Sequence, residues 1–581
     1  MSDEGVFNTL GGKFEARLRR QEERRRSGGG RENEIVVVSQ VALIEVKFHP
    51  EVFRVLQKPQ FFAVEDIPNQ YLIYEVASVV PLHYQMVGMD EKLPRDIRWE
   101  MMESISQSWQ ESSETWINVW AVPTKYRMIL NNGRPDFVRD ASIPLPGSVV
   151  HLLSRSTVES FLSWDDGVEI GQLIGFERPL KVNLEFMIKY HMGAFGFTGS
   201  GKSNLLSYLI RLSLRRFTDL KVVVFDVAGE YGIHLLDLLL NEGELYSTEN
   251  IGRSPEVFLE SQAIPETLEE ELERRGIRDL REYARMLIDG GRVKRLTTVG
   301  FSPPTLRELI DEINESLGTV AALKERQFLS DLINRIGYSD DTPLTSLSGS
   351  DREKLIETLR GITKGVSNRS NIYGELISLI DYLSSRQEGS EEGPSSMSSD
   401  RLADYIIGGG SRRLTVVYVP DPTDARQVVA KFIERLLYLK KTRGVGTRVL
   451  VVLDEAQEFI PDRVTEKDHS DASNRAVEAL LRQGRKYRAH CWISTQRLAH
   501  LNTNAVQQLH SYFVSTLPRL YDRLVIADAF SLNTDIVERT TDLETGQWLF
   551  VSYRATRQKN VPVFIQVPNN ETELVNELAK I

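Results

Sequence analysis

The sequence of 581 residues contains a single cysteine, Cys491, so an internal disulfide is excluded. This cysteine stands in the apolar segment "HCWIST", where a small buried residue is expected. No run approaches the roughly 18 apolar residues that a membrane-spanning helix needs. The first residues also lack the apolar stretch of a secretory signal. These absences predict a cytoplasmic protein without a membrane segment.

An excess of positive charge is also missing, because 71 Lys and Arg residues face 82 Asp and Glu residues, a net charge of −11. A surface coated with basic patches is therefore not expected. Binding of nucleic acid stays open, since a channel or groove needs only local positive charge. The contents of 41% hydrophobic and 26% charged residues are typical of a globular protein, and the length suggests about four domains.

The first 33 residues are polar. Seven Lys and Arg residues stand between Lys13 and Arg26, and three glycines follow at 28–30. We interpret 1–33 as a mobile basic tail, with a short basic helix as one alternative. Contact with nucleic acid and a merely solvated tail are both open.

Residues 34–187 contain short β-branched or aromatic runs separated by turn residues, such as "EIVVVSQVALIEV" and "QYLIYEVASVV". This spacing predicts a small barrel or sandwich, here an N-terminal β-barrel domain. Only the stretch 89–112 within it is helical in pattern.

From residue 188 onward, strand and helix patterns alternate. A strand, a Gly-rich loop, a helix and the buried run "KVVVFDV" predict a parallel sheet with helices on both faces, an α/β fold. The predicted segments are an α/β core over 188–232 and 401–560, a helical insertion over 233–385, a low-complexity loop over 386–400 and a C-terminal extension over 561–581.

The segment "GFTGSGKS", residues 196–203, matches the phosphate-binding pattern G-x-x-x-x-G-K-[ST] between a strand and a helix. Its glycines let backbone N–H groups turn toward phosphate oxygens, aided by the positive end of the next helix. Lys202 is expected at the β and γ phosphates and the Ser203 hydroxyl on Mg²⁺. The residues predicted to bind the nucleotide are Gly196, Thr198, Gly199, Ser200, Gly201, Lys202, Ser203 and Asn204.

Two further strands end in acidic residues, "VFDVAGEY" at 224–231 and "VLVVLDEAQEF" at 449–459. ATP hydrolysis needs one carboxylate for Mg²⁺ and another group that orients the attacking water. The adjacent pair Asp454 and Glu455 supplies both. We therefore predict that Asp454 is a metal ligand and that Glu455 is the catalytic glutamate, which polarises the water. Asp226 and Glu230 are predicted as a supporting pair, with a simple strand-end cap as the alternative for Asp226.

These motifs, together with "HMGAFGFTGSGKSNLL", "LDEAQEFIP", "RQGRKYRAHCWISTQR" and "PVFIQVP", resemble the HerA branch of the HerA/FtsK translocase superfamily. The resemblance spans about 34–568, and "LPGSVVHLLS" and "VEIGQLIG" are similar to the family's HAS barrel. It implies a RecA-like P-loop NTPase core, whose parallel sheet has an additional strand, that uses ATP and Mg²⁺. It further implies a homo-hexamer with double-stranded DNA in its pore and a NurA-like nuclease partner. Other relatives serve antiviral defence or DNA transfer.

The resemblance also assigns roles by position. It gives the P-loop lysine and the magnesium hydroxyl to Lys202 and Ser203, the Walker B pair to Asp454 and Glu455, and the polar sensor to Gln496. A trans-acting arginine, which would reach the ATP of a neighbouring subunit, is implied in the basic segment that holds Arg482, Arg485 and Lys486. The alternative for these cations is a solvated helix end.

Three departures from the family pattern indicate a divergent branch. Tyr190 and His191 stand where many relatives have Arg-His. Val227 and Ala228 replace a proline and a histidine, and Gln457 ends a DEAQ rather than a DEAH motif.

Sequence-independent movement along DNA requires contacts to phosphates. Two loops are candidates, 461–475 and 362–374, and ordinary surface connections are the alternative. The basic residues in question are Arg463, Lys467, Arg475, Lys364 and Arg369.

The leading functional hypothesis is a ring-forming, ATP-dependent translocase or helicase on double-stranded DNA that works with a nuclease in DNA end processing. The second is an ATP-binding ring scaffold that assembles and activates a nuclease or another effector. A membrane-linked DNA-transfer ATPase is disfavoured by the lack of a membrane segment.

Overall fold

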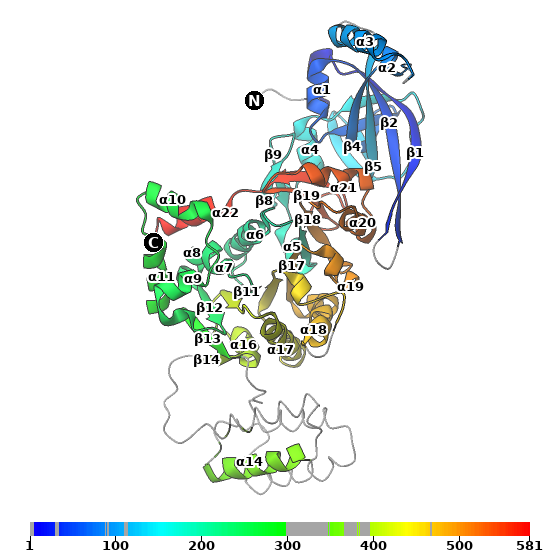
Figure 1. Cartoon of the computed structure of the whole chain (residues 1–581). Coiled ribbons are helices and arrows are strands. Elements are labelled where there is room, and N and C mark those ends of the chain that lie inside the picture. Colours follow the sequence, from blue (N-terminus) through cyan, green and yellow to red (C-terminus); the bar gives the residue numbers. More distant parts are fainter. Residues whose placement is uncertain are drawn as a thin grey trace. The chain divides into compact units, whose positions relative to one another are not determined.

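The computed structural model of the chain divides into two units (Figure 1). The first comprises Met1–Tyr246, Ile251–Val293 and Tyr405–Ile581, and the second Ser247–Asn250 and Lys294–Asp404. The residues that the structure describes are 5–29, 34–87, 89, 92–109, 114–297, 347, 349–364, 380, 383, 396–444, 446–464 and 468–581.

The N-terminal sheet of the first unit closes on itself. Its order is β2-β1-β7-β3-β4-β5-β6, and β5 also pairs with β2, so hydrogen bonding runs around a ring. Its identity with the HAS barrel of the family stays a prediction. The strands are β1 (Ala16–Gly29), β2 (Glu34–Lys47), β3 (Phe61–Ile67), β4 (Gln70–His83), β5 (Thr115–Asn131), β6 (Arg134–Arg139) and β7 (Val149–Leu152).

The prediction of a mobile tail over 1–33 is wrong for 16–29, which form strand β1 and pair with β2 along their whole length. The arginines of β1 look solvated in the sequence, but their partners lie some 500 residues away. Arg24 and Arg26 form ion pairs with Asp535 at 3.0 and 2.8 Å, and Arg26 also reaches Glu538.

The second sheet has the order β12-β15-β11-β16-β17-β10-β18-β19-β20-β8-β9 within the first unit. Pairings from β15 to β18 are parallel and those from β18 to β9 antiparallel. The α/β prediction is thereby confirmed. The strands are β8 (Val168–Leu173), β9 (Arg178–Val182), β10 (Met192–Phe195), β11 (Leu220–Asp226), β12 (Gly243–Ser247), β15 (Leu414–Tyr418), β16 (Arg448–Leu453), β17 (Ala489–Thr495), β18 (Ser511–Val514), β19 (Gln547–Ser552) and β20 (Val563–Gln566).

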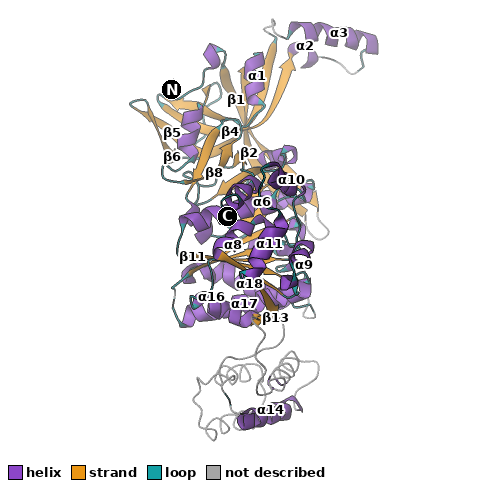
Figure 2. Cartoon of the chain, turned by 90° about the vertical axis from the view of Figure 1, so that its left-hand side faces the viewer, coloured by secondary structure: helices purple, strands orange, loops and turns teal. Residues whose placement is uncertain are grey.

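Helices cover both faces of this sheet (Figure 2). Successive side chains of a strand point to opposite faces, so each buried strand packs against helices on both sides. On β11, Val222 and Val224 join the core cluster that includes helix α6 (Lys202–Arg216). Phe225 faces the other way and contacts Phe432 of α17 (Pro422–Thr442), with ring centroids 5.3 Å apart.

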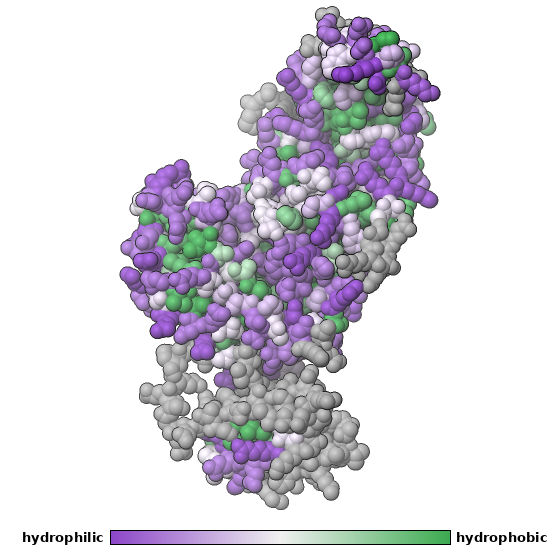
Figure 3. All heavy atoms as spheres, viewed as in Figure 1, coloured by the Kyte–Doolittle hydropathy of each residue, from purple (hydrophilic) through white to green (hydrophobic). Residues whose placement is uncertain are grey.

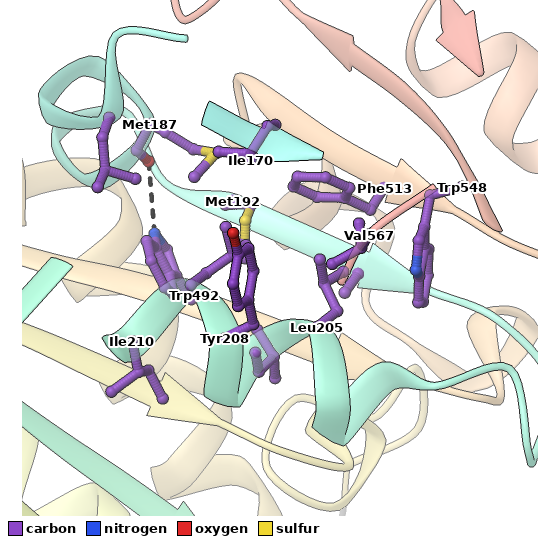
Figure 4. Packing of buried hydrophobic residues seen from close by; sticks show 14 of the residues in the cluster. Ile170, Met187, Met192, Leu205, Tyr208, Ile210, Trp492, Phe513, Trp548 and Val567 are labelled. Carbon is purple, nitrogen blue, oxygen red and sulfur yellow. Dashed lines mark hydrogen bonds between the residues drawn. The ribbon is translucent and has the colours of Figure 1, made fainter. Parts of the chain in front are cut away.

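The core under α6 is built from large apolar side chains (Figure 4). Leu205 and Tyr208 of α6 pack with Met192 of β10 and with Trp492 of β17. The indole N–H of Trp492 donates a hydrogen bond to the Met187 carbonyl at 3.4 Å. This packing fixes the helix that follows the phosphate-binding loop against the centre of the sheet.

The remaining helices of the first unit surround the two sheets. They are α1 (Pro50–Leu56), α2 (Tyr84–Val87), α3 (Arg95–Ser108), α4 (Arg155–Leu162), α5 (Leu184–Lys189), α7 (Tyr231–His234), α8 (Leu236–Glu242), α9 (Pro255–Glu260), α10 (Glu266–Arg274), α11 (Leu280–Asp289), α18 (Ser470–Gln483), α19 (Thr503–Val506), α20 (Leu520–Ala529), α21 (Thr534–Glu538) and α22 (Asn570–Leu578). In the second unit, α14 (Gly349–Lys364) is described, and β13 (Val293–Thr297) pairs in parallel with β14 (Ser396–Ser398). Helix α16 (Ser399–Ile407) spans the boundary between the units.

Four predicted segments have wrong boundaries. Strands β8 and β9 lie inside 34–187 but extend the second sheet, and β20 of the predicted C-terminal extension pairs in it with β8 and β19. The part of 233–385 that forms α8 to α11 belongs to the first unit, with β12 in its sheet. Of the predicted loop 386–400, the last residues form β14 and the start of α16, and 386–395 lie outside the described residues.

The face of the chain in Figure 3 is largely hydrophilic, with small separate hydrophobic patches. One exposed group belongs to α3, where Trp99 is 62% exposed. Within the described ranges, no helix has both the length and the apolar character that a bilayer crossing requires.

The C-terminal helix α22 is attached to α6 by a buried hydrogen bond and an ion pair nearer the surface. Arg211 of α6 is fully buried, forms an ion pair with Asp237 and donates to Asn570 Oδ1 at 3.2 Å. Near the surface, Arg215 of α6 pairs with Glu577 at 2.8 Å. The residues read as a C-terminal extension are thus an integral part of the core.

Substituting Asp237→Ala should lower the free energy of unfolding by about 3–5 kcal/mol, because a buried guanidinium would lose its counter-ion. The matched control Glu577→Ala removes an exposed partner of α6 and should cost less than about 1 kcal/mol. Equilibrium urea unfolding of the full chain measures both. Equal effects of the two substitutions would contradict this account.

Candidate active site

The predicted phosphate-binding loop lies between β10 and α6, the strand–loop–helix context that the motif requires. Gly199 and Gly201 have φ of 81° and 91°, a left-handed conformation that favours glycine. The Lys202 ammonium, almost buried, donates to the carbonyls of Gly196 at 3.1 Å and Phe197 at 3.3 Å. The loop therefore combines a cation, backbone amides and the N-terminus of a 15-residue helix.

The two acidic strand ends meet at the same edge of the sheet as this loop. Strands β11 and β16 are parallel neighbours with Phe225 opposite Leu453, so Asp226 and Asp454 come at equivalent positions. Asp226 accepts hydrogen bonds from the N–H groups of Gly229 at 2.8 Å and Tyr231 at 2.9 Å. Asp454 accepts one from the Ser494 hydroxyl. Asp226 thus organises its own turn, which supports the predicted cap alternative.

The turn that Asp226 holds delivers Glu230 to the phosphate-binding loop. The Ser203 hydroxyl donates a hydrogen bond to Glu230 Oε2. Glu230 therefore contacts Ser203, the residue predicted to bind magnesium. The sequence did not indicate this contact, because Glu230 comes four residues after the end of the strand. The charge of Glu230 also raises the pKa of Asp454, so the two carboxylates lie close together.

Glu455 is held by two glutamine side chains of the site. Its carboxylate accepts from Gln457 Nε2 at 2.9 Å and from Gln496 Nε2 at 3.0 Å. Gln496 in turn accepts a hydrogen bond from the Thr198 hydroxyl. Glu455 has a φ of 49°, an uncommon conformation for a non-glycine residue and frequent at functional sites. Gln496 therefore links the predicted catalytic acid to the phosphate-binding loop.

The position of Gln496 follows from the strand order. Strand β17 lies between β16 and β10 and is parallel to both, with Phe195 opposite Thr495. The strand that bears the sensor is thus the additional strand between the phosphate-binding loop and Asp454.

Burial first, and then the charge of the neighbouring carboxylates, raise the pKa of Asp226 to about 7 and that of Asp454 to about 6. The pKa of Glu455 is also raised, first by burial and then by the charge of Asp454. Concentrated negative charge in a buried place is stabilised by a cation. A divalent cation bound at the site would therefore stabilise these carboxylates.

The oxygen donors here, the Ser203 hydroxyl and the carboxylates of Asp454 and Glu230, are of the kind that Mg²⁺ prefers. Among the described residues no group of three or more His, Cys, Asp or Glu has the geometry to hold a metal ion. Mg²⁺ is usually bound by one or two carboxylates together with substrate phosphates, and its binding at this site stays a prediction.

The side chains of two residues predicted to bind the nucleotide, Asn204 and Ser200, are engaged or buried elsewhere. The Asn204 amide donates to the Pro568 carbonyl at 3.1 Å, and its oxygen accepts from the Asn570 N–H at 2.6 Å. Asn204 thus attaches the C-terminal segment to α6. The Ser200 side chain is buried inside the loop. The remaining predicted residues, whose nucleotide contacts stay a prediction, form the loop and the start of α6: Gly196, Thr198, Gly199, Gly201, Lys202 and Ser203.

The predicted trans-acting arginines lie at the opposite edge of the sheet. Arg482 ends α18 and pairs with Glu478 at 3.4 Å, and Arg485 lies in the 3₁₀ turn Gly484–Tyr487, just before β17 begins. The seven residues of β17 span about 20 Å, at about 3.3 Å per residue. Neither arginine therefore reaches this chain's own phosphate-binding loop.

Arg485 has a specific support that the sequence did not reveal. Its guanidinium lies over the ring of Tyr190, 5.2 Å from the centroid, and Arg554 lies over the same ring at 5.4 Å. The Tyr190 ring also packs against His510 at 5.1 Å. The tyrosine that departs from the family's Arg-His pattern thus holds two arginines at the amino edge of the sheet.

Of the predicted DNA contacts, Arg475 lies in helix α18 rather than in a loop, is exposed and pairs with Asp471 at 2.8 Å. Arg463 belongs to the segment between β16 and α18. Lys364 ends α14, so the predicted loop 362–374 begins inside a helix. Lys467 and Arg369 lie outside the described residues.

The fold and the site define a P-loop ATPase. Residues 168–433 match the family model described as "Helicase HerA, central domain". A curated relative, "Probable helicase MJECL08" of Methanocaldococcus jannaschii, is 20% identical over 544 residues, covering 89% of this chain and 92% of the relative. The resemblance to HerA-like ATPases that the sequence motifs predicted is thereby confirmed.

Solved structures give weaker likenesses. The structure of VirB4 of Thermoanaerobacter pseudethanolicus is 15% identical with a TM-score of 0.38, covering 70% of this chain and 97% of VirB4. The bacterial conjugative coupling protein TrwBdeltaN70 is 12% identical with a TM-score of 0.33, covering 72% and 92%.

A buried histidine adds a pH-dependent element at the amino edge. His490 of β17 is 3% exposed and lies near His191, Arg448, Lys440 and Arg488. Burial, and then these cations, lower its pKa to about 3. Since the unfolded value is about 6.5, the neutral imidazole favours the fold above pH 6.5, and this contribution is lost as the pH falls below it.

From pH 7.5 to 5.5 this histidine should cost the wild-type chain about 1 kcal/mol of stability. A His490→Leu variant cannot take up the proton, so its free energy of unfolding should fall by about 1 kcal/mol less over the same interval. Urea unfolding at the two pH values measures this double difference, in which the titrations of Asp226 and Asp454 cancel. An equal pH dependence of both proteins would show that His490 is not held neutral.

Proposed function

We propose that this protein is a ring-forming motor that hydrolyses ATP to move along or pump double-stranded DNA. The observation that carries the proposal is the separation between the two parts of the site. The phosphate-binding loop and the acids lie at one edge of the sheet, and Arg482 and Arg485 at the other. In a head-to-tail ring, the amino edge of one copy can face the phosphate-binding loop of the next.

Within one copy, each group has a separable task. Lys202, the loop amides and the start of α6 would hold the phosphates. Mg²⁺, when bound, would neutralise phosphate charge, with Ser203 and Asp454 as its protein ligands and Glu230 accepting from the Ser203 hydroxyl in the structure. Glu455 would polarise the attacking water, and Gln496 would orient Glu455 while contacting Thr198.

Arg485 is the better candidate for the trans-acting cation. Arg482 is engaged by Glu478 on its own helix, whereas Arg485 is exposed and supported by Tyr190. A guanidinium from the next subunit would stabilise the charge of the transferred phosphoryl group, so hydrolysis would require assembly. The family description and the relative named a probable helicase support a role on DNA. A hexameric ring, a nuclease partner and a cytoplasmic location stay predictions from the sequence.

Double-stranded DNA should stimulate the steady-state ATPase rate of the wild-type chain, because a motor couples turnover to its track. The rate is measured by phosphate release, with duplexes of increasing length. In Lys202→Ala, which lacks the phosphate-binding cation, turnover should vanish with or without DNA. A wild-type rate that no duplex length changes would favour the scaffold hypothesis over the motor.

Mixing two inactive variants tests the shared site. Glu455→Gln removes the water-orienting acid, and Arg485→Ala removes the cation, each lowering turnover by on the order of 10³-fold. In mixed rings, some interfaces combine an intact acid with an intact arginine, so part of the ATPase activity should return.

Lys486→Ala is the matched control, since it removes an exposed neighbouring cation that does not contact Tyr190, and it should keep its activity. Failure of the mixture to recover turnover at any ratio would rule out Arg485 as the trans-acting residue. Loss of activity in Lys486→Ala with retention in Arg485→Ala would reassign the role to Lys486.

A further inference from the structure

A second segment, Leu543–Gly546, lies against the outer side of the phosphate-binding loop. It connects the 3₁₀ turn Arg539–Asp542 to β19. The Thr545 hydroxyl donates a hydrogen bond to the Gly199 carbonyl at 3.1 Å, and the Gly546 N–H donates to the Ser200 carbonyl at 3.2 Å. A Cβ on Gly201 would stand 3.5 Å from the Gly546 nitrogen, so the two backbones are in contact.

These two bonds fix the orientation of consecutive peptide planes. In a trans peptide the carbonyl and the next N–H point in opposite directions. A carbonyl of Ser200 held outward by Gly546 therefore directs the N–H of Gly201 to the other side, toward the interior of the loop. The carbonyl of Gly199, held by Thr545, likewise leaves the N–H of Ser200 on the opposite side of its peptide, where it closes a turn within the loop by donating to the Phe197 carbonyl at 3.2 Å. Inward N–H groups are what a phosphate-binding loop uses.

The segment is itself anchored at both ends. The Thr516 hydroxyl donates to the Leu543 carbonyl at 3.0 Å, and the Val567 N–H donates to the Gly546 carbonyl at 3.0 Å. Thr516 also accepts, through its own carbonyl, the N–H of Phe197 in the phosphate-binding loop. The phosphate-binding loop thus forms hydrogen bonds both with Thr516, which follows β18, and with the segment Leu543–Gly546.

We propose that Thr545 is a positioning residue of the nucleotide site, which orders the peptide between Gly199 and Ser200 before the phosphates bind. This rests on the proposed nucleotide role of the phosphate-binding loop. The contact of Thr545 is with the Gly199 carbonyl of the loop. Its side chain is exposed, so its removal leaves no cavity in the core.

The test is the affinity of the full chain for a fluorescent ATP analogue with Mg²⁺, by titration. Thr545→Val keeps the shape and removes the hydroxyl, and it should raise the dissociation constant about three- to tenfold, the worth of one hydrogen bond. Thr545→Ser keeps the hydroxyl and should bind within about twofold of wild type. The control Thr541→Val removes an exposed hydroxyl that donates to the Glu538 carbonyl and should leave the affinity unchanged.

A thermal unfolding midpoint of Thr545→Val equal to that of wild type, with weakened binding, supports the proposal. Wild-type affinity of Thr545→Val, an equal loss in Thr541→Val or in Thr545→Ser, or a lowered unfolding midpoint of Thr545→Val overturns it. The variant Lys202→Ala distinguishes failure of the proposed function from failure of the Thr545 proposal. If Lys202→Ala binds the analogue like wild type, the nucleotide role of the loop itself is wrong.

Discussion

The site depends on the parallel register of four neighbouring strands, β11, β16, β17 and β10. Because parallel strands end at the same edge of a sheet, their carboxyl ends bring together groups that are far apart in the sequence. Asp226, Asp454 and Gln496 follow three of these strands, and the phosphate-binding loop follows the fourth. A slip of one residue in any pairing would turn the polar end groups to the other face of the sheet.

The same register separates charge along the strands. Buried carboxylates with raised pKa values occupy the carboxyl edge, and a buried neutral histidine, His490, stands among the cations of the amino edge. Asp219 compensates part of that positive charge by pairing with Arg448 at 2.7 Å and Arg488 at 2.8 Å. Carboxylates thus gather at one edge of the sheet and cations at the other, an arrangement that suits the proposed head-to-tail assembly of identical copies.

The sequence predicted what is local. The phosphate-binding loop and the acidic strand ends are contiguous motifs, and buried strand runs indicated the parallel sheet. Contacts between segments that are distant in the sequence could not be predicted from it. The arginines of β1 looked like a solvated tail because their acidic partners, Asp535 and Glu538, come about 500 residues later. Strands β8 and β9 were assigned to the N-terminal domain because nothing in their composition shows which sheet they join.

At the site itself the same distinction holds. Glu230 was recognised as an acid near the site, but its contact with Ser203 depends on the turn that Asp226 organises. Thr545 belongs to no motif, and only the folded chain brings it to Gly199. Segments α21 and Arg539–Asp542, which lead to Thr545, also carry Arg539, whose guanidinium donates to the Val76 carbonyl of the closed sheet at 2.8 Å. The segment that supports the phosphate-binding loop is therefore itself attached to the closed sheet.

The central claim is that one copy holds the phosphates and acids while a neighbouring copy supplies the cation. The most direct test is ATP turnover per chain measured over a wide range of protein concentrations, with the molar mass determined at each concentration. The account predicts that turnover per chain is negligible for the monomer and rises in step with assembly. Full turnover by the monomer, unchanged across the range, would contradict it.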